Sequence, residues 1–254
     1  KRTSLGRFAH ESAAMSTPVV GQPLAFYMGD DARNEYIYKF VSATRWSAAD
    51  ATAADRLAVG DKFLDNGTLH VAAFDADGTG RWIELTIADP RISGFAAYPF
   101  ANQADVVVNA RLAGDAVGAT RMDRPEWCAV HPTTGEVYFT LTNNSNRRVE
   151  PTGSSQLAPD SANPRVYVDQ KGSTAQNGNP NGHILRMREG AAGAAATTFT
   201  WDVYLFGAES GANAATVNLS SLTDDQDFSS PDGLVFSQAT GICWIQTDDG
   251  AYTD

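Results

Sequence analysis

Short runs in which apolar and polar residues alternate, bounded by Gly, Pro, Asn and Asp, dominate the chain and predict β-strands. Helical spacing is scarce, and the one helix that the pattern predicts covers residues 48–57, with Ser47 as its N-cap. Residues 147–181 are polar and rich in Pro, Asn, Gly and Ser; because a strand pattern resumes directly after them, they are interpreted as one long excursion loop. Strands are predicted at residues 24–28, 35–42, 68–74, 81–87, 127–131, 136–142, 183–188, 199–206, 234–237 and 242–247. The predicted fold class is therefore all-β.

An internal repeat organises these strands. Residues 125–144 run through an acidic residue, a strand, a Thr-Gly turn, a second strand and a pair of Asn residues, and residues 231–249 follow the same order. A weaker copy covers residues 10–31. Two more strands follow each of the two copies nearest the N-terminus, and four antiparallel strands per repeat are typical of a β-propeller blade. We expect residues 1–254 to be a portion of a single β-propeller domain, with blade-like repeats beginning near residues 5, 120 and 228.

Acidic and amide side chains occupy equivalent positions of the repeat. The first strand of each blade lines the central channel, so equivalent residues of successive blades converge on one axis. Glu11, Glu126 and Asp232 share the first-strand position, and the pairs at residues 30–31, 143–144 and 248–249 end the second strand. Converging carboxylates repel one another unless cations neutralise them. A set of oxygen ligands favours Ca²⁺, Mg²⁺ or Fe³⁺ over zinc.

Composition excludes several classes of protein. The formal net charge of −11 repels phosphate backbones and argues against a nucleic-acid partner. No apolar run reaches the length of a membrane span. Cys128 and Cys243 are too few for a disulfide-rich scaffold; one disulfide between them is possible, and two free thiols are the commoner case. The chain lacks a Gly-x-Ser-x-Gly elbow, a phosphate-binding P-loop and a His-Glu-x-x-His motif, which argues against the enzyme classes that use them.

Arg124 and Glu126 form the densest candidate for chemistry. Pro125 between them removes a backbone donor and stiffens the segment, so the two side chains are expected to be presented as a fixed pair. A guanidinium beside a metal cluster would bind a tetrahedral oxyanion through two hydrogen bonds. The alternative is a surface ion pair at the start of a strand. The position of Glu126 in the repeat favours the functional interpretation.

Five segments carry a resemblance to a known family. They lie at residues 5–11, 122–127, 163–165, 182–184 and 230–233. The amino-acid sequences of these segments and their order along the chain resemble those of the PhoX family of alkaline phosphatases, and the resemblance covers residues 5–249. The resemblance implies a six-bladed β-propeller that is exported by the twin-arginine route to the periplasm or the cell exterior. It further implies hydrolysis of small phosphate monoesters by a cluster of Ca²⁺ and Fe³⁺ bridged by an oxo group.

The resemblance also assigns roles to individual residues. The metal ligands it implies are Glu11, Asp30, Glu126 and Asp232, the phosphate-binding residue is Arg124, and further candidates are Asp31, Asn143 and Asn144. In the mechanism it implies, the metals bind the phosphoryl oxygens and a metal-bound oxo or hydroxide group attacks phosphorus. Arg124 then stabilises the charge on the equatorial oxygens.

Two departures from the family shape the expectation for this chain. An iron-ligating cysteine of the family lies upstream of residues 6–8, and two and a half blades do not close a ring of six. We therefore expect a portion of such an enzyme, with an incomplete metal site and impaired activity in isolation. Two alternatives remain from the residues alone. One is a non-catalytic calcium-binding propeller module, and the other is a lactonase-type propeller hydrolase, in which Asn143 and Asn144 could be ligands of one Ca²⁺.

Overall fold

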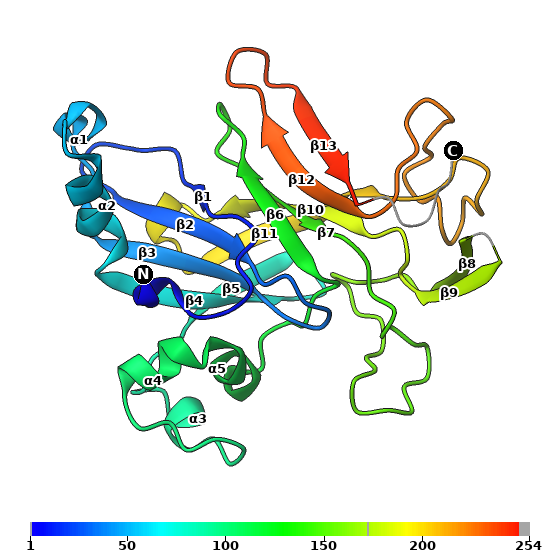
Figure 1. The fold of residues 1–254 in the computed structure, drawn as a ribbon, viewed down its shortest axis with the longest axis horizontal. Helices are drawn as coiled ribbons and strands as arrows, with labels where there is room; N and C mark the ends of the chain where they lie inside the picture. Colours follow the sequence, from blue (N-terminus) through cyan, green and yellow to red (C-terminus); the bar gives the residue numbers. More distant parts are fainter. Residues whose placement is uncertain (1, 172, 249–254) are drawn as a thin grey trace.

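The structure is a computed structural model that describes residues 2–171 and 173–248. In the N-terminal part of the chain, five antiparallel strands pair in chain order and form one blade (Figure 1). They are β1 (Ala14–Met15), β2 (Pro23–Gly29), β3 (Ile37–Arg45), β4 (Gly67–Phe74) and β5 (Thr79–Glu84). Aromatic and β-branched residues dominate the first half of β3, and side chains of these types pack well on a pleated surface.

A second blade follows in the middle of the chain. Its strands are β6 (Pro125–Val130), β7 (Val137–Leu141), β10 (His183–Glu189) and β11 (Thr198–Phe206). The outer strands β5 and β11 pair antiparallel, so the two blades form one sheet of nine strands in the order β1-β2-β3-β4-β5-β11-β10-β7-β6. Gly80 allows this pairing, because a Cβ atom at that position would collide with the ring of Phe199 on β11.

A hairpin begins a third unit. It consists of β12 (Pro231–Phe236) and β13 (Cys243–Thr247), which form a separate two-stranded sheet. In Figure 1 this hairpin, in orange and red, lies against β6 and β7. The hydroxyl of Thr140 donates to the carbonyl of Asp232 at 2.7 Å, and the hydroxyl of Thr142 donates to the carbonyl of Pro231 at 2.8 Å. Each of the ten strands predicted from the sequence has its counterpart in the structure.

The main core lies between the two blades. Tyr27 and Trp82 of the first blade pack in one apolar cluster with Phe139 and Leu185 of the second. Burial of such side chains contributes roughly 1.5–3 kcal/mol each. A second cluster covers the other face of the first blade, and a smaller one lies between the second blade and the β12–β13 hairpin. The packing therefore fixes the blades relative to one another.

The helices differ from the prediction. Residues 48–57 were expected to form one helix, but two are present, α1 (Ala48–Thr52) and α2 (Arg56–Leu64). The backbone becomes extended at Ala53, which ends α1. Asp55 then caps the N-terminus of α2 by accepting a hydrogen bond from the backbone N–H of Ala58. The expected start of α1 is confirmed, since Asp50 accepts a hydrogen bond from the backbone of Ser47 at 2.8 Å.

Three unpredicted helices cover the outer face of the first blade (Figure 1). They are α3 (Pro90–Ser93), α4 (Gln103–Val108) and α5 (Ala110–Val117). Val106, Ala110, Ala113 and Val117 are buried and follow a helical spacing, so a signal was present in the sequence. Short single-turn 3₁₀ helices occur at η1 (Thr3–Leu5) and η2 (Gly193–Ala195). In the part of the chain that the structure describes, no helix is long and apolar enough to cross a membrane.

The excursion loop at residues 147–181 is largely irregular, as expected, but it contains one hairpin. Its strands are β8 (Tyr167–Lys171) and β9 (Thr174–Gly178). Their sequences are mostly polar and lack apolar alternation, which explains why the pattern did not reveal them. The two cysteines are free thiols; Cys128 is buried and Cys243 is half-buried.

Candidate metal centre

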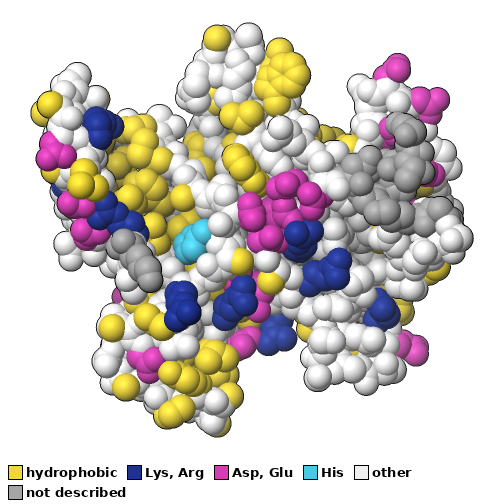
Figure 2. Space-filling model, viewed as in Figure 1, with side chains coloured by type: hydrophobic (Ala, Val, Ile, Leu, Met, Phe, Trp, Pro, Cys, Tyr) yellow, Lys and Arg dark blue, Asp and Glu magenta, His cyan; other side chains and the backbone are white. Residues whose placement is uncertain are grey.

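Carboxylate groups from three parts of the chain lie together on one face of the molecule. Glu126 is on β6, Asp232 is on β12 and Asp248 follows β13 directly. One carboxylate oxygen of each lies within 4.8 Å of one oxygen of the other two. Figure 2 shows acidic side chains gathered at the centre of the face, with Lys and Arg side chains beside them. One cation could contact all three residues, which we call the acidic trio.

Burial makes Glu126, the innermost member of the acidic trio, costly to ionise. Glu126 is 2% exposed, and its Oε1 atom forms an ion pair with Arg124 but no geometrically good hydrogen bond, while the buried Oδ1 atom of Asp232 has no hydrogen-bond partner among the described residues. Burial, followed by the proximity of Asp232, raises the pKa of Glu126 to about 9. Carboxylates that share a buried site cannot all ionise without a large penalty. A bound cation would remove this penalty and give the two oxygens a partner.

Two further acidic residues border the trio. Glu11 precedes β1 and Asp31 follows β2, so both come from the first blade. The pKa of Glu11 is raised, first by desolvation and then by the negative charges of Asp31, Asp232 and Asp248. Four of the residues selected from the sequence, Glu11, Asp31, Glu126 and Asp232, therefore lie in one place. All of them offer oxygen atoms alone, which is the ligand set that hard cations prefer.

Arg124 lies in the middle of these acids. Its Nε atom is 2.7 Å from Asp31 Oδ1, its Nη2 atom is 3.1 Å from Glu126 Oε1, and its Nη1 atom is 3.4 Å from Asp248 Oδ2. The guanidinium thus links an acid of the first blade to acids of the second blade and the hairpin. Its charge lowers the pKa of both Glu11 and Glu126, against the effect of burial.

The backbone at Arg124 adopts an unusual conformation that the neighbouring Asp123 holds in place. Arg124 has a φ of 60°, in the left-handed region that costs a non-glycine residue roughly 1–2 kcal/mol. Asp123 is fully buried, and its Oδ1 atom accepts hydrogen bonds from Arg147 at 2.7 Å and from Asn144 at 2.8 Å. Its Oδ2 atom accepts one from Asn179 at 3.0 Å. The excursion loop supplies Arg147 and Asn179, so its contacts with Asp123 stabilise the segment that contains Arg124.

Asp30, predicted to be a metal ligand, pairs with a basic side chain and does not belong to the acidic trio in this structure. Asp30 is fully buried and forms a two-point ion pair with Arg111 of α5, at 2.6 Å to Nε and 2.5 Å to Nη2. Its Oδ1 atom also accepts a hydrogen bond from the backbone of Ala9 at 3.1 Å. Both oxygens are therefore engaged. The physical consequence is that Asp30 ties the segment before Glu11 to the segment that carries Asp31.

The two Asn candidates are also engaged elsewhere. Asn144 belongs to the buried network around Asp123, and its side-chain oxygen accepts from the backbone of Asn146 at 2.8 Å. The Oδ1 atom of Asn143 accepts two hydrogen bonds from Arg33, from Nε at 3.1 Å and from Nη2 at 2.8 Å. Neither amide oxygen is left for a cation in this arrangement. A calcium site built on these two residues is thus not favoured.

Replacing Asp30 with Asn should lower stability and leave metal binding in place. The variant loses an ion pair whose carboxylate end is fully buried, and we expect the free energy of unfolding to fall by about 2 kcal/mol. Denaturant titration and elemental analysis measure the two quantities. Asp31→Asn is the matched control, because it removes the next carboxylate along the chain and should lower the metal content instead. Loss of metal from D30N at unchanged stability would make Asp30 a ligand.

Three residues of this region were not among the candidates chosen from the sequence, although the repeat placed residue 248 at the end of a second strand. Asp248 had a signal, because it stands at the end of the third copy of the repeat; Asp249 lies outside the described residues. Arg111 lies on α5, a helix that was not predicted. Arg33 lies in the turn after β2 and matches no motif. Arg111 could have been found by recognising the helical spacing of the apolar residues in 103–117.

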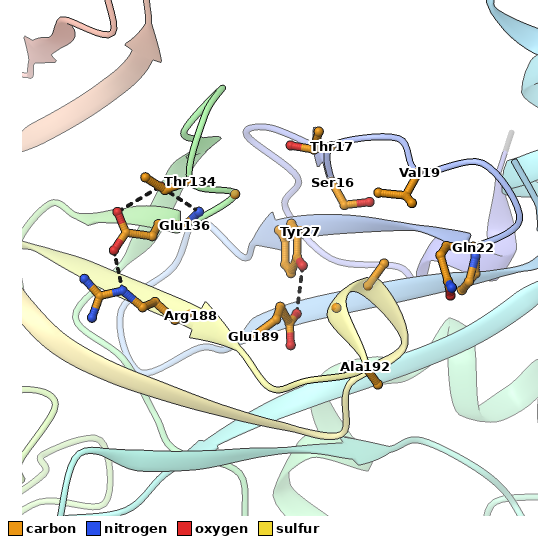
Figure 3. A pocket seen from close by; sticks show the side chains of 14 residues that line it. Ser16, Thr17, Val19, Gln22, Tyr27, Thr134, Glu136, Arg188, Glu189 and Ala192 are labelled. Atoms are coloured by element: carbon orange, nitrogen blue, oxygen red, sulfur yellow. Dashed lines mark hydrogen bonds and ion pairs between the residues drawn. The ribbon is translucent and has the colours of Figure 1, made fainter. Parts of the chain in front are cut away.

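A cavity of about 580 Å³ lies at the other end of the strands (Figure 3). Its lining includes Gln22 and Pro23 at the start of β2, whereas Asp31 follows the end of that strand. At its floor, the carboxylate of Glu189 accepts hydrogen bonds from Tyr27 at 2.7 Å and from the buried Lys39 at 2.8 Å. All these polar groups have partners. The cavity is therefore separate from the acidic trio, and its buried ion pair joins the two blades.

Blades whose inner strands bring carboxylates together around one arginine define a β-propeller with an acidic centre. The family described as alkaline phosphatase PhoX matches residues 1–254, and the chain belongs to that family. The structure of Pseudomonas fluorescens PhoX in complex with vanadate, a transition state analogue, is similar to this chain, with 40% sequence identity and a TM-score of 0.76. The match covers 98% of this chain and 40% of that one. No match to a curated protein was found.

These comparisons confirm the predicted family and the all-β propeller class. The chain spans about 40% of the length of the Pseudomonas fluorescens protein. The activity of the whole protein therefore enters below as a proposal.

Proposed function

We propose that this chain supplies part of an active site that hydrolyses small phosphate monoesters with the help of Ca²⁺ and Fe³⁺. The observation that supports it most is the position of Arg124, which contacts Asp31, Glu126 and Asp248 at once. A cationic group with several N–H donors inside a cluster of metal-ligating oxygens is suited to bind a phosphoryl group. The family match and the similarity to a protein that binds vanadate point to the same chemistry.

The residues present fit hard cations. Asp232 Oδ1 is buried without a hydrogen-bond partner in the described part of the chain, Glu126 Oε1 meets only Arg124 there, and both are oxygen ligands of the kind that Ca²⁺ and Fe³⁺ prefer. Glu126, Asp232 and Asp248 would hold one ion, and Glu11 and Asp31 would extend the ligand set. When bound, the metals neutralise these carboxylates, polarise the phosphoryl oxygens and supply the nucleophile.

Arg124 has a defined task in this proposal. Arg124 would give up the oxygens of Asp31 and Glu126 when these carboxylates hold cations, and its N–H groups would then be free for the substrate. The guanidinium then holds two phosphoryl oxygens and stabilises the charge that develops on them. The left-handed backbone at Arg124 and the buried carboxylate of Asp123 fix the side chain in advance, which lowers the entropy lost on binding.

The site of action proposed for the whole protein is the periplasm or the cell exterior, in line with the export route implied by the family resemblance. Small phosphomonoesters are the proposed substrates. The lactonase-type alternative is disfavoured, since the oxygens of Asn143 and Asn144 are already engaged.

Removal of the metals should abolish phosphatase activity. Treatment with a chelator is expected to lower p-nitrophenyl phosphate hydrolysis by at least about 100-fold and to lower the melting temperature, and added Ca²⁺ and Fe³⁺ should restore both. Elemental analysis of the same samples gives the metal content. Metal-dependent melting without turnover, in the longest form of the protein that contains this chain, would instead indicate a structural calcium module.

A further inference from the structure

A second guanidinium is fixed beside Arg124. Arg33 forms a backbone bridge with Asp123, the residue next to Arg124, and the backbone N–H of Asn34 donates to the carbonyl of Met122 at 3.0 Å. These contacts hold the turn after β2 against the segment that carries Arg124. The two arginines are close enough that the charge of Arg124, after the larger effect of burial, lowers the pKa of Arg33.

Asn143 fixes the side chain of Arg33 without neutralising it. Its Oδ1 atom accepts from both Nε and Nη2 of the guanidinium, so one edge of the group is held in a single orientation. Asn143 is itself positioned by its neighbour Thr142, whose backbone N–H donates to the carbonyl of Arg124 at 3.1 Å. An amide oxygen carries no net charge. Arg33 therefore keeps its full positive charge, with the Nη1 end making no hydrogen bond to another described residue.

Arg33 differs from Arg124 in its partners. Arg124 has three carboxylates within ion-pair distance, whereas Arg33, partly covered by its neighbours but still open to solvent, forms no ion pair with a carboxylate in residues 2–171 and 173–248. Arg124 is among the main charges that act on Glu11 and Glu126, and Arg33 is not. Arg33 is thus further from the acidic trio than Arg124 is, and it lies beside Asn143.

Two like charges held side by side, of which Arg33 is fixed by a neutral amide, favour an anion that can meet both. We propose that Arg33 binds a second oxyanion of the substrate, carried by the leaving group near the scissile phosphate. The inference rests on the proposed phosphatase function, in which Arg124 holds the phosphoryl group. It makes Arg33 a residue that selects among phosphate monoesters, with a preference for those that carry a second negative charge.

Two substrates that differ at one carbon test this preference. 3-Phosphoglycerate carries a carboxylate where glycerol 3-phosphate carries a hydroxymethyl group, and the metal-loaded protein should hydrolyse the former with the higher kcat/KM. Arg33→Gln is expected to lower the ratio of the two kcat/KM values by about 10–100-fold, which is the range for a lost hydrogen bond to a charged group. The change should fall on KM for 3-phosphoglycerate, because the carboxylate is bound equally in the ground and transition states.

A matched variant and a control sharpen the test. Asn143→Asp keeps Arg33 in place but pairs it with a carboxylate, so this variant should lower the ratio in the same direction. Arg45→Gln removes an exposed arginine that contacts the carbonyl of Gly21, near the start of β2, and should leave the ratio unchanged. An unchanged ratio in R33Q, or equal losses for both substrates, would overturn the role of Arg33 alone. All these assays use the longest form of the protein that contains this chain, and a metal-loaded wild type of that form that hydrolyses neither compound would overturn the proposed function as well.

Discussion

Replacing Glu126 with Gln is expected to remove most of the bound metal and to lower phosphatase activity by at least about 100-fold. Glu126 is the most buried member of the acidic trio, and its Oε1 atom lies 3.1 Å from Nη2 of Arg124. An amide supplies one neutral oxygen in place of a charged carboxylate, so the affinity for a hard cation falls steeply. Elemental analysis and a p-nitrophenyl phosphate assay on the same preparation measure both effects.

The same substitution should have the opposite effect on the metal-free protein. The pKa of Glu126 is about 9 in the folded state, above the ordinary value of 4.5 for Glu. Between these two values the unfolded state binds fewer protons than the folded state, so the free energy of unfolding falls as the pH rises. E126Q removes this dependence, and at pH 8 the metal-free variant should be more stable than the metal-free wild type.

Glu189→Gln is the control for this pair of effects. Glu189 is a buried acid of the same type, but it is paired with Lys39 at the far end of the strands. The variant should lose stability and keep its metal. A metal content in E126Q equal to that of the wild type, or a metal-free E126Q that is less stable than the wild type at pH 8, would contradict the assignment of Glu126.

Replacing Arg124 with Gln is expected to lower kcat/KM for phosphate monoesters by about 100–1,000-fold. The variant loses the charge and the paired N–H donors that would hold the phosphoryl group, while the carboxylates of Asp31, Glu126 and Asp248 remain. Because Arg124 competes with cations for these oxygens, the metal content should stay the same or rise. The combination of retained metal and lost turnover separates a substrate-binding residue from a ligand.

Two comparisons complete the experiment on Arg124. Arg124→Lys keeps the charge but has no planar pair of donors, so it should recover only part of the activity. Arg45→Gln, a surface arginine far along β3, should behave like the wild type. Normal kinetics in R124Q would exclude Arg124 from phosphate binding, and loss of metal from R124Q would show that its main task is to hold the acids together.

The repeat in the sequence carried most of the information about the fold and the site. Alternation of apolar and polar residues reports local burial, so the ten predicted strands correspond to observed ones. The equivalent positions of Glu11, Glu126 and Asp232 predicted that residues far apart in the chain approach one another, and the structure brings them together with Asp31.

What the sequence did not resolve depends on tertiary contacts. Asp30 and Asp31 are adjacent in an extended segment, so their side chains point in opposite directions, and a repeat alignment does not say which one faces the channel. In the structure, Asp30 is turned away from the acidic trio because it binds Arg111. Arg111 lies on α5, a short helix that was not predicted from the sequence. The buried contacts of Asp123 likewise involve Arg147 and Asn179, which are dozens of residues away in the chain.

The pairing of β5 with β11 has a mechanical consequence for catalysis. It joins the two blades through a continuous ladder of backbone hydrogen bonds. Asp31, which follows β2, and Arg124, which precedes β6, are therefore attached to the same rigid sheet. Asp232 and Asp248 belong to a hairpin outside that ladder, which is held by apolar contacts and by the hydroxyls of Thr140 and Thr142. The spacing between Asp31 and Arg124 should therefore stay constant as substrate arrives and product leaves, because both residues are attached to the nine-stranded sheet.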